Sequence, residues 1–319
     1  MREQGAIPLV PEFPMKPLRG IALKIASVVV FISMASLIKA VAPHVPPGEA
    51  VFFRSLFAIP VILIWLGASR ELSVGLTVQN PMAHVWRGVV GTTAMGLGFA
   101  GLGLLPLPDV TAIGYAAPLM TVVFAAMFLN EEVRLFRLTA VALGMIGVMI
   151  VLSPRLTALG TDSIAPREAL GAMVVLTGAA FVALAQVFVR KLVQTERTSA
   201  IVFWFSVTST VLSLITLPFG WVLPDPREAS LLVLAGLLGG VGQILLTSSY
   251  RHADASVVAP FDYTSMLLAL GIGYFVFGEV PTLVMLGGAA LVIAAGVLII
   301  WRERALGIER GKQRKAMTP

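Results

Sequence analysis

Cysteine is absent from this chain of 319 residues, and charged residues make up only 13% of it. The lack of cysteine excludes disulfides, thiolate metal sites and a cysteine nucleophile. The only histidines are His44, His84 and His252, which are too scattered along the sequence for a metal site. No Walker loop is present, so hydrolysis of a nucleoside triphosphate is not expected either. These absences favour a protein that is not an enzyme and needs no cofactor.

Hydrophobic residues, by contrast, make up 57% of the chain, and the mean hydropathy is +0.92. A soluble domain could not cover its surface with this composition. A bilayer core about 30 Å thick needs roughly 20 apolar residues as helix, and ten stretches come close to that length. They are Leu18–Val41, Ala50–Leu66, Trp86–Leu105, Val110–Leu129, Leu138–Leu152, Leu170–Val189, Ile201–Leu217, Leu231–Tyr250, Ser256–Phe277 and Leu283–Trp301. The stretches are too long for buried strands, which run about 4–8 residues, and Val28–Ile32 lacks the alternation of a barrel strand. We predict an all-α membrane protein with ten transmembrane helices.

The basic residues indicate an orientation for these spans. If the amino terminus is cytoplasmic, the opposite side holds only Lys39, Arg155, Arg167 and Arg227. The cytoplasmic segments then hold Arg2, Lys16, Arg19, Arg70, Arg87, Arg134, Arg137, Arg190, Lys191, Arg197, Arg251, Arg302, Arg304, Arg310, Lys312, Arg314 and Lys315. This bias predicts that both termini are cytoplasmic. The pI of about 10 and net charge of +6 are therefore explained by topology, without a nucleic-acid partner.

The ten spans divide into two halves of five around a polar segment. Asp109-Val110-Thr111-Ala112 opens the fourth span, and Asp254-Ala255-Ser256-Val257 opens the ninth in a similar way. Because five is odd, the second half must lie upside down relative to the first, as in many secondary transporters. We expect a disordered cytoplasmic lead (1–17), a first repeat (18–153), an external linker (154–169), a second repeat (170–301) and a basic cytoplasmic tail (302–319).

Several segments, taken together and in order, resemble a known family. They are Glu49-Ala50-Val51-Phe52-Phe53-Arg54, Trp86-Arg87-Gly88, the run from Leu105 to Ala112 with Ala117-Pro118-Leu119, Arg190-Lys191-Leu192, and the run from Ser256 to Thr264. In these segments the chain resembles the EamA-type transporters of the drug/metabolite transporter superfamily, over essentially all of Leu18–Trp301. Within that superfamily it resembles bacterial carriers of riboflavin and of S-adenosylmethionine, and also exporters of amino acids and other metabolites.

This resemblance implies a secondary transporter in the bacterial inner membrane, working by alternating access on a small organic solute. The expected activity is import of riboflavin or of an S-adenosylmethionine-like solute. The alternative is export of amino acids or other metabolites. The expected partners are this solute and the lipid bilayer, with proton coupling as one option and no nucleic acid. Both a monomer and a homodimer remain open. A membrane-embedded enzyme would show an acidic or histidine cluster at one face, and a channel would show a continuous polar stripe; neither is evident.

Charged residues inside the spans are candidates for function, because each costs about 2.5–3.5 kcal/mol at mid-bilayer. Lys24 and Lys39 lie near span ends, from which their side chains can reach the head groups. Arg54 is expected to guard the outer approach, while Arg87 and Asp262 enter the membrane to similar depths from the same side. Two interpretations stay open: Arg87 and Asp262 form a structural salt bridge, or they line a polar cavity in which Asp262 binds a proton.

Uncharged residues complete the predicted site. Gln186 and Gln243 are polar groups inside spans, with hydrogen bonding between helices as the simpler role. Pro118 and Pro260 each leave a backbone carbonyl without its helical partner. We therefore predict a cargo site between the third, fourth, eighth and ninth spans, with the substrate-binding residues Arg54, Arg87, Tyr115, Pro118, Gln186, Gln243, Asp262 and Tyr263.

Overall fold

The computed structural model describes residues 17–70, 72–129, 135–157, 165–192, 195–252 and 259–316. The expected lead lies outside the described residues except for Pro17, which begins the first helix. The start of the ninth span, including Asp254, also lies outside them. The expected linker 154–169 is partly helical, because the helices on either side reach Thr157 and begin again at Ala165.

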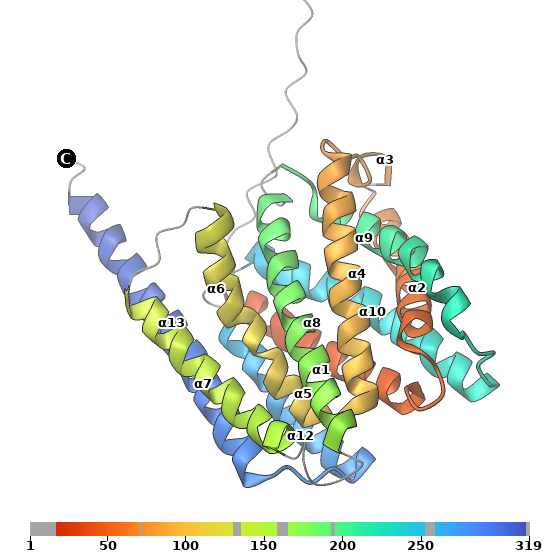
Figure 1. Ribbon diagram of the computed structural model, residues 1–319. Coiled ribbons are helices and arrows are strands. Elements are labelled where there is room, and N and C mark those ends of the chain that lie inside the picture. Colours follow the sequence, from red (N-terminus) through yellow and green to blue (C-terminus); the bar gives the residue numbers. More distant parts are fainter. Residues whose placement is uncertain are drawn as a thin grey trace, which may run out of the picture.

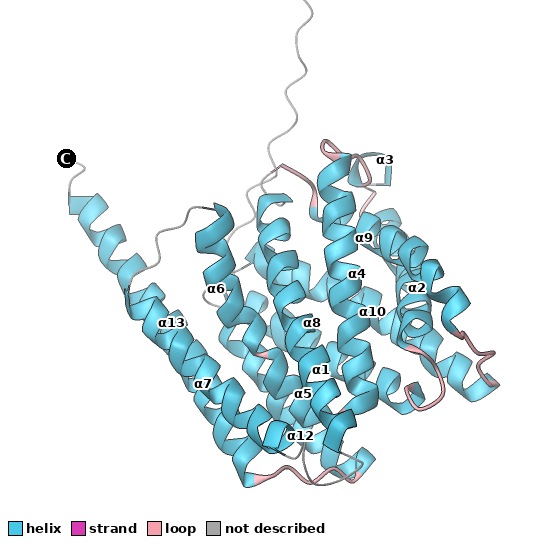
Figure 2. Cartoon of the chain, in the orientation of Figure 1, coloured by secondary structure: helices cyan, strands magenta, loops and turns pink. Residues whose placement is uncertain are grey.

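The described part of the chain is a bundle of helices without a strand (Figures 1 and 2). In the first half the elements are α1 (Pro17–Val41), α2 (Pro47–Ala68), α3 (Leu72–Gly75), α4 (Pro81–Leu104), α5 (Leu107–Gly114), α6 (Ala116–Leu129) and α7 (Leu135–Thr157). In the second half they are α8 (Ala165–Leu192), α9 (Thr198–Ser213), the 3₁₀ helix η2 (Leu214–Phe219), α10 (Pro226–His252), the 3₁₀ helix η3 (Ala259–Tyr263), α12 (Thr264–Phe277) and α13 (Leu283–Ala316). The expected tail from residue 302 continues α13 as helix.

Length and composition make this a multi-pass membrane protein. Among the described residues, six helices are long and apolar enough to cross a bilayer, and three further apolar helices are shorter. Helix α4 is long but carries Arg87 and six glycines, which lower its mean hydropathy. Large apolar side chains such as Leu267 and Phe275 lie exposed on α12, as expected for a surface that faces lipid tails.

The fourth span is broken. Helix α5 ends at Gly114, Tyr115 forms a turn, and α6 begins at Ala116. Pro118 has no N–H for the carbonyl of Gly114 four residues earlier, so the helical hydrogen bonds stop there. Pro118, which we expected to leave a backbone carbonyl without its helical partner, lies four residues after Gly114 and thus marks this break.

The ninth span changes helix type at a comparable place. Its described part begins as the 3₁₀ helix η3 and becomes α-helical only at Thr264. Two hydroxyls satisfy carbonyls at this junction: Thr264 Oγ1 donates to Phe261 O at 2.6 Å, and Ser265 Oγ donates to Asp262 O at 2.6 Å. Hydroxyls that bond to backbone in this way stabilise a helix end against unpaired carbonyls.

Helices from different halves lie side by side throughout the bundle. Helix α1 packs along α10, α4 along α8, and α7 along α13, while α2 contacts α9 and α10. The buried apolar residues form one large cluster around α5–α8 with α13, a second around α1, α2, α4 and α10, and a small third cluster between α2 and α9. The polar residues described next lie buried among these helices.

Candidate functional site

The two broken spans meet inside the bundle. The rings of Tyr115, in the turn between α5 and α6, and Tyr263, at the end of η3, pack edge to face with centroids 5.0 Å apart. The Tyr115 hydroxyl lies 2.7 Å from Ser265 Oγ and 3.4 Å from the carbonyl oxygen of Tyr263. Since the single proton of Ser265 is used on Asp262 O, Tyr115 is the donor in its bond to Ser265. A relay of hydroxyls thus joins the two breaks.

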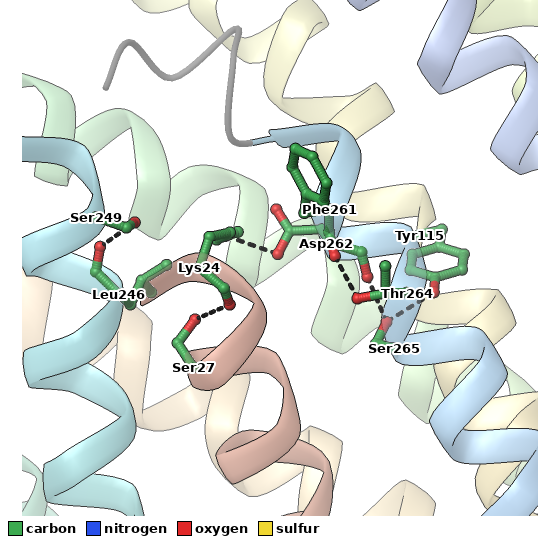
Figure 3. Close-up of polar contacts among 9 residues, drawn as sticks. All are labelled: Lys24, Ser27, Tyr115, Leu246, Ser249, Phe261, Asp262, Thr264 and Ser265. Atoms are coloured by element: carbon green, nitrogen blue, oxygen red, sulfur yellow. Dashed lines mark hydrogen bonds and ion pairs between the residues drawn. The ribbon is translucent and has the colours of Figure 1, made fainter. Parts of the chain in front are cut away.

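Asp262 lies next to this relay and is paired with Lys24 of α1. Lys24 Nζ is 2.7 Å from Asp262 Oδ1, and Figure 3 shows the two side chains pointing toward each other. The Lys24 side chain is 3% exposed, whereas that of Asp262 is 43% exposed. A buried ammonium is tolerated only with such a partner. We refer to Lys24, Tyr115, Asp262, Tyr263 and Ser265 as the break cluster.

This pairing corrects two expectations. The proposed salt bridge between Arg87 and Asp262 is wrong, because Asp262 pairs with Lys24. The assignment of Lys24 to the lipid head groups is also wrong, since the residue is buried. Distance from a span end cannot show whether a lysine faces lipid or a neighbouring helix, and only the packing of α1 against η3 decides it.

The two arginines form a separate cluster around Phe205. Arg54 of α2 and Arg87 of α4 place their guanidinium carbons 5.8 Å and 4.1 Å from the centroid of the Phe205 ring on α9. Both distances are in the range of cation–π contacts. Arg54 is 2% exposed, and its expected role at the outer approach stays a prediction. We call Arg54, Arg87 and Phe205 the arginine cluster.

Neither guanidinium is neutralised by the described residues. The Nε and Nη1 atoms of both arginines are buried without a hydrogen-bond partner there. No described carboxylate lies within 4.0 Å of them, and the nearby acids are used elsewhere. Glu49 accepts from Val222 N, Glu196 from Gln79 N and Asn80 N, Asp262 pairs with Lys24, and Glu279 pairs with Lys39. Such a pair of buried like charges is costly to fold.

Small residues make room for the arginines, and hydroxyls lie close by. A Cβ atom at Gly91 would collide with Arg87 Nη1 and lie 2.7 Å from Phe205 Cε2, and one at Gly239 would lie 2.9 Å from Arg54 Nε. Thr92 Oγ1 and Ser209 Oγ form a 2.8 Å hydrogen bond between α4 and α9, while Ser55 Oγ is buried without a partner in the described chain.

The remaining predicted residues lie outside both clusters. Pro118 is exposed on α6 and Gln186 is exposed on α8, so neither is placed with the buried polar groups. Gln243 is half-buried on α10, one turn after Gly239. The structure thus brings together Tyr115, Asp262 and Tyr263 in one place, and Arg54 with Arg87 in another.

Phe205 is a functional candidate that sequence reasoning did not single out, and Lys24 and Lys39 are candidates that it had assigned to the lipid head groups. Phe205 is one of 17 phenylalanines and carries no local signal. Lys39 Nζ lies 2.8 Å from Glu279 Oε1 and also donates to the carbonyl of Leu105 at 2.8 Å, while Glu279 Oε2 accepts from Leu107 N. Lys24, two turns into α1, and Lys39, near the end of α1, therefore tie this helix to η3 and to the loop that follows α12.

A cleft of about 230 Å³ opens at the Lys39 end of the bundle. It is lined mainly by apolar residues of α1, α2 and α4, with Arg167 as the charged residue in its lining. Ala50 in this lining precedes Arg54 by four residues, so the two share a face of α2. The cleft therefore begins one helical turn from the arginine cluster.

Residues 18–153 and 169–301 each match the EamA-like transporter family. The chain belongs to the EamA-like transporter family. It is therefore a multi-pass membrane transporter of the drug/metabolite transporter superfamily and not an enzyme, and the resemblance seen in the sequence is confirmed.

Relatives of this EamA-like transporter include both exporters and importers. A pseudopaline exporter of Pseudomonas aeruginosa is 30% identical over 285 residues, covering 88% of this chain and 93% of the relative. A riboflavin transporter of Rhizobium johnstonii is 30% identical over 259 residues, covering 81% and 82%. An S-adenosylmethionine uptake transporter of Rickettsia bellii is 27% identical over 259 residues, covering 80% and 84%. One crystal structure shares the fold, with a TM-score of 0.64 at 18% identity over 90% of this chain and 98% of the other.

Proposed function

We propose that this EamA-like transporter is a secondary active transporter that moves a small organic metabolite across the bacterial inner membrane by alternating access. The observation that carries the proposal is the meeting of the α5–α6 break with the η3–α12 junction, one from each half, through Tyr115 and Tyr263. Discontinuous helices that meet inside the membrane form the substrate region in many secondary transporters. Buried polar groups at this depth are expensive and so favour a transport role over a purely structural one.

An inverted repeat is supported by the way the helices pair. If α1 corresponds to α8 and α4 to α10, the pair α1–α10 becomes α8–α4 when the halves are exchanged, and both pairs are in contact. The pairs α2–α9 and α7–α13 map onto themselves, as expected for helices beside a two-fold axis. Two five-span repeats, 18–153 and 170–301, agree with the two family matches.

The two ion pairs of α1 provide gates for alternating access. Lys24–Asp262 and Lys39–Glu279 join α1 to the η3–α12 segment near opposite ends of the bundle. If one ion pair breaks while the other stays formed, the contact between α1 and the η3–α12 segment would open toward one side of the membrane only. Asp262, which is 43% exposed and paired, is the group placed to exchange a proton during this cycle.

The basic residues support an orientation with both termini in the cytoplasm. A reporter enzyme that is active only in the periplasm, fused after Pro319, should be inactive, and a cytoplasmic reporter at the same point should be active. Activity of the periplasmic reporter would overturn the orientation without affecting the fold.

For cargo, the relatives favour two classes of solute. Import is supported by the S-adenosylmethionine uptake transporter, a riboflavin-like cargo by the riboflavin transporter, and export of a metabolite by the pseudopaline exporter. Direction depends on the gradient that is coupled, so it does not follow from the residues of the site.

Counterflow in liposomes tests the mechanism. Vesicles with purified protein, loaded with a candidate solute, should accumulate the same labelled solute transiently and with saturable kinetics. Asp262→Asn should abolish concentrative uptake driven by a proton gradient while leaving counterflow in place. A flux that rises linearly with concentration and shows no counterflow would identify a channel and sink the proposal.

A further inference from the structure

The arginine cluster has the features of an anion site whose anion is missing from the chain. Arg54 and Arg87 come from two different helices, and both present buried Nε and Nη1 donors without a partner among the described residues. The carboxylates that could neutralise them are bound elsewhere, to Lys24, Lys39 or backbone N–H groups. Two uncompensated positive charges at this depth destabilise the fold, so binding of a solute that supplies negative charge should stabilise it.

The form of the cluster narrows the chemistry of that solute. Guanidinium groups form strong charge-assisted hydrogen bonds with carboxylates, and Nε and Nη1 of both arginines are donors that the described residues leave unused. Phe205 packs against both guanidinium groups and so places an aromatic side chain beside the two charges, which suits a solute with a planar ring. Arg167 in the cleft at the Lys39 end adds a positive charge along the approach.

We infer that the cargo is an organic acid with a planar ring, whose carboxylates bind Arg54 and Arg87 and whose ring packs against the side chain of Phe205. The physiological meaning of this inference rests on the proposed transport function. Binding of the acid at the arginine cluster, however, can be tested independently of transport. Among the cargo classes considered above, the inference favours an S-adenosylmethionine-like solute, which bears a carboxylate, over riboflavin, which has none.

Binding to purified protein in nanodiscs tests the inference with defined probes. Phthalate, a dicarboxylate on a planar aromatic ring, should bind saturably by calorimetry and raise the thermal midpoint, whereas its neutral analogue phthalamide should not. Cyclohexane-1,2-dicarboxylate keeps both charges but has no flat ring. It should bind more weakly than phthalate, and Phe205→Leu should remove that difference.

Variants of the arginines provide the second arm. Arg54→Gln and Arg87→Gln should each weaken phthalate binding about tenfold to hundredfold, the range for one charged hydrogen-bond pair. Gly239→Ala keeps both charges but displaces the Arg54 side chain, so it should weaken binding at unchanged net charge. Arg227→Gln removes an exposed arginine at the start of α10 and should leave binding unchanged.

Equal binding of phthalate and phthalamide, or equal losses in Arg87→Gln and Arg227→Gln, would overturn the inference. If a glutamine variant does not fold, Arg87→Lys retains the charge but not the two-pronged geometry, and it should still weaken phthalate binding. Absence of phthalate binding together with intact counterflow of another metabolite would refute the acid site alone. Phthalate binding without any counterflow would instead refute the transport mechanism alone.

Discussion

The break cluster and the arginine cluster are both buried and polar, but only the break cluster contains a counter-charge for its cation. In the break cluster Lys24 is matched by Asp262, and the hydroxyls of Tyr115 and Ser265 are used in a relay. In the arginine cluster two cations face one aromatic ring without a described counter-charge. The first arrangement holds the two halves together in the absence of a ligand, whereas the second is completed only when a ligand arrives.

This difference has a thermodynamic consequence. Removing one member of an ion pair leaves the other charge buried and unpaired, which destabilises the fold. Removing one of two uncompensated like charges instead relieves their repulsion. Stability and transport should therefore respond in the same direction to changes in the break cluster, and in opposite directions to changes in the arginine cluster.

The largest effect on stability is expected for Asp262→Asn. This change strands the buried ammonium of Lys24, and breaking a buried ion pair costs about 3–5 kcal/mol, with the lower end expected because Asp262 is partly exposed. Thermal unfolding in detergent should show a lower midpoint, and the double variant with Lys24→Gln should recover at least half of the loss. Glu228→Gln, which breaks the exposed contact with His44, is the control. A double variant as unstable as Asp262→Asn would show that the pair contributes nothing.

A change of opposite sign is expected for Arg87→Gln. Loss of one like charge should leave the unfolding free energy unchanged or raise it by about 1 kcal/mol, while counterflow of an acidic cargo falls at least tenfold. Parallel measurement of the thermal midpoint and of counterflow separates the two effects. A destabilisation as large as that of Asp262→Asn would mean that Arg87 is a structural partner, and the contrast between the clusters would disappear.

A smaller loss is expected for Tyr115→Phe, which keeps the ring against Tyr263 but removes the hydroxyl that donates to Ser265. One hydrogen bond of this kind contributes about 1 kcal/mol. Chemical denaturation compared with Tyr274→Phe, which alters an exposed tyrosine of α12, measures the difference. Identical stabilities of the two variants would argue against the relay.

The smallest effect concerns pH at the surface contact between His44 and Glu228. The hydrogen bond that His44 donates to Glu228, and then the charge of this carboxylate, raise the pKa of His44 above 6.5. Because the folded-state pKa is the higher one, this stabilisation is complete below about pH 6.5 and is lost as the pH rises through the raised pKa. The thermal midpoint of the parent relative to His44→Gln should therefore fall across that range. A difference independent of pH would exclude the contact.

Sequence reasoning predicted the family, the helical class and the residues that lie at the two breaks. Pro118 and Pro260 marked the broken spans because a missing N–H has the same effect in any helix. Tyr115 and Tyr263 were placed in one site on the strength of their neighbouring prolines and depth, and the structure brings their rings into contact.

The partners of the charged residues could not be predicted in the same way. Arg87 and Asp262 enter from the same side at similar depth, but α1 with Lys24 lies against η3 and takes the carboxylate. Phe205 became visible as a candidate only when α2, α4 and α9 were placed side by side. Depth along a span is a one-dimensional quantity, whereas the choice of partner depends on how each helix is rotated about its axis.

Helix α1 also has a mechanical consequence for the whole molecule. Its two lysines lie about 22 Å apart along the helix axis, at roughly 1.5 Å of rise per residue, and each is held to the η3–α12 segment. A stiff rod anchored at two points behaves as a lever: a tilt of roughly 10° about its middle moves each end by about 2 Å in opposite directions. That displacement is enough to pull one ion pair apart while pressing the other together, so a single rigid helix can make the two exits mutually exclusive.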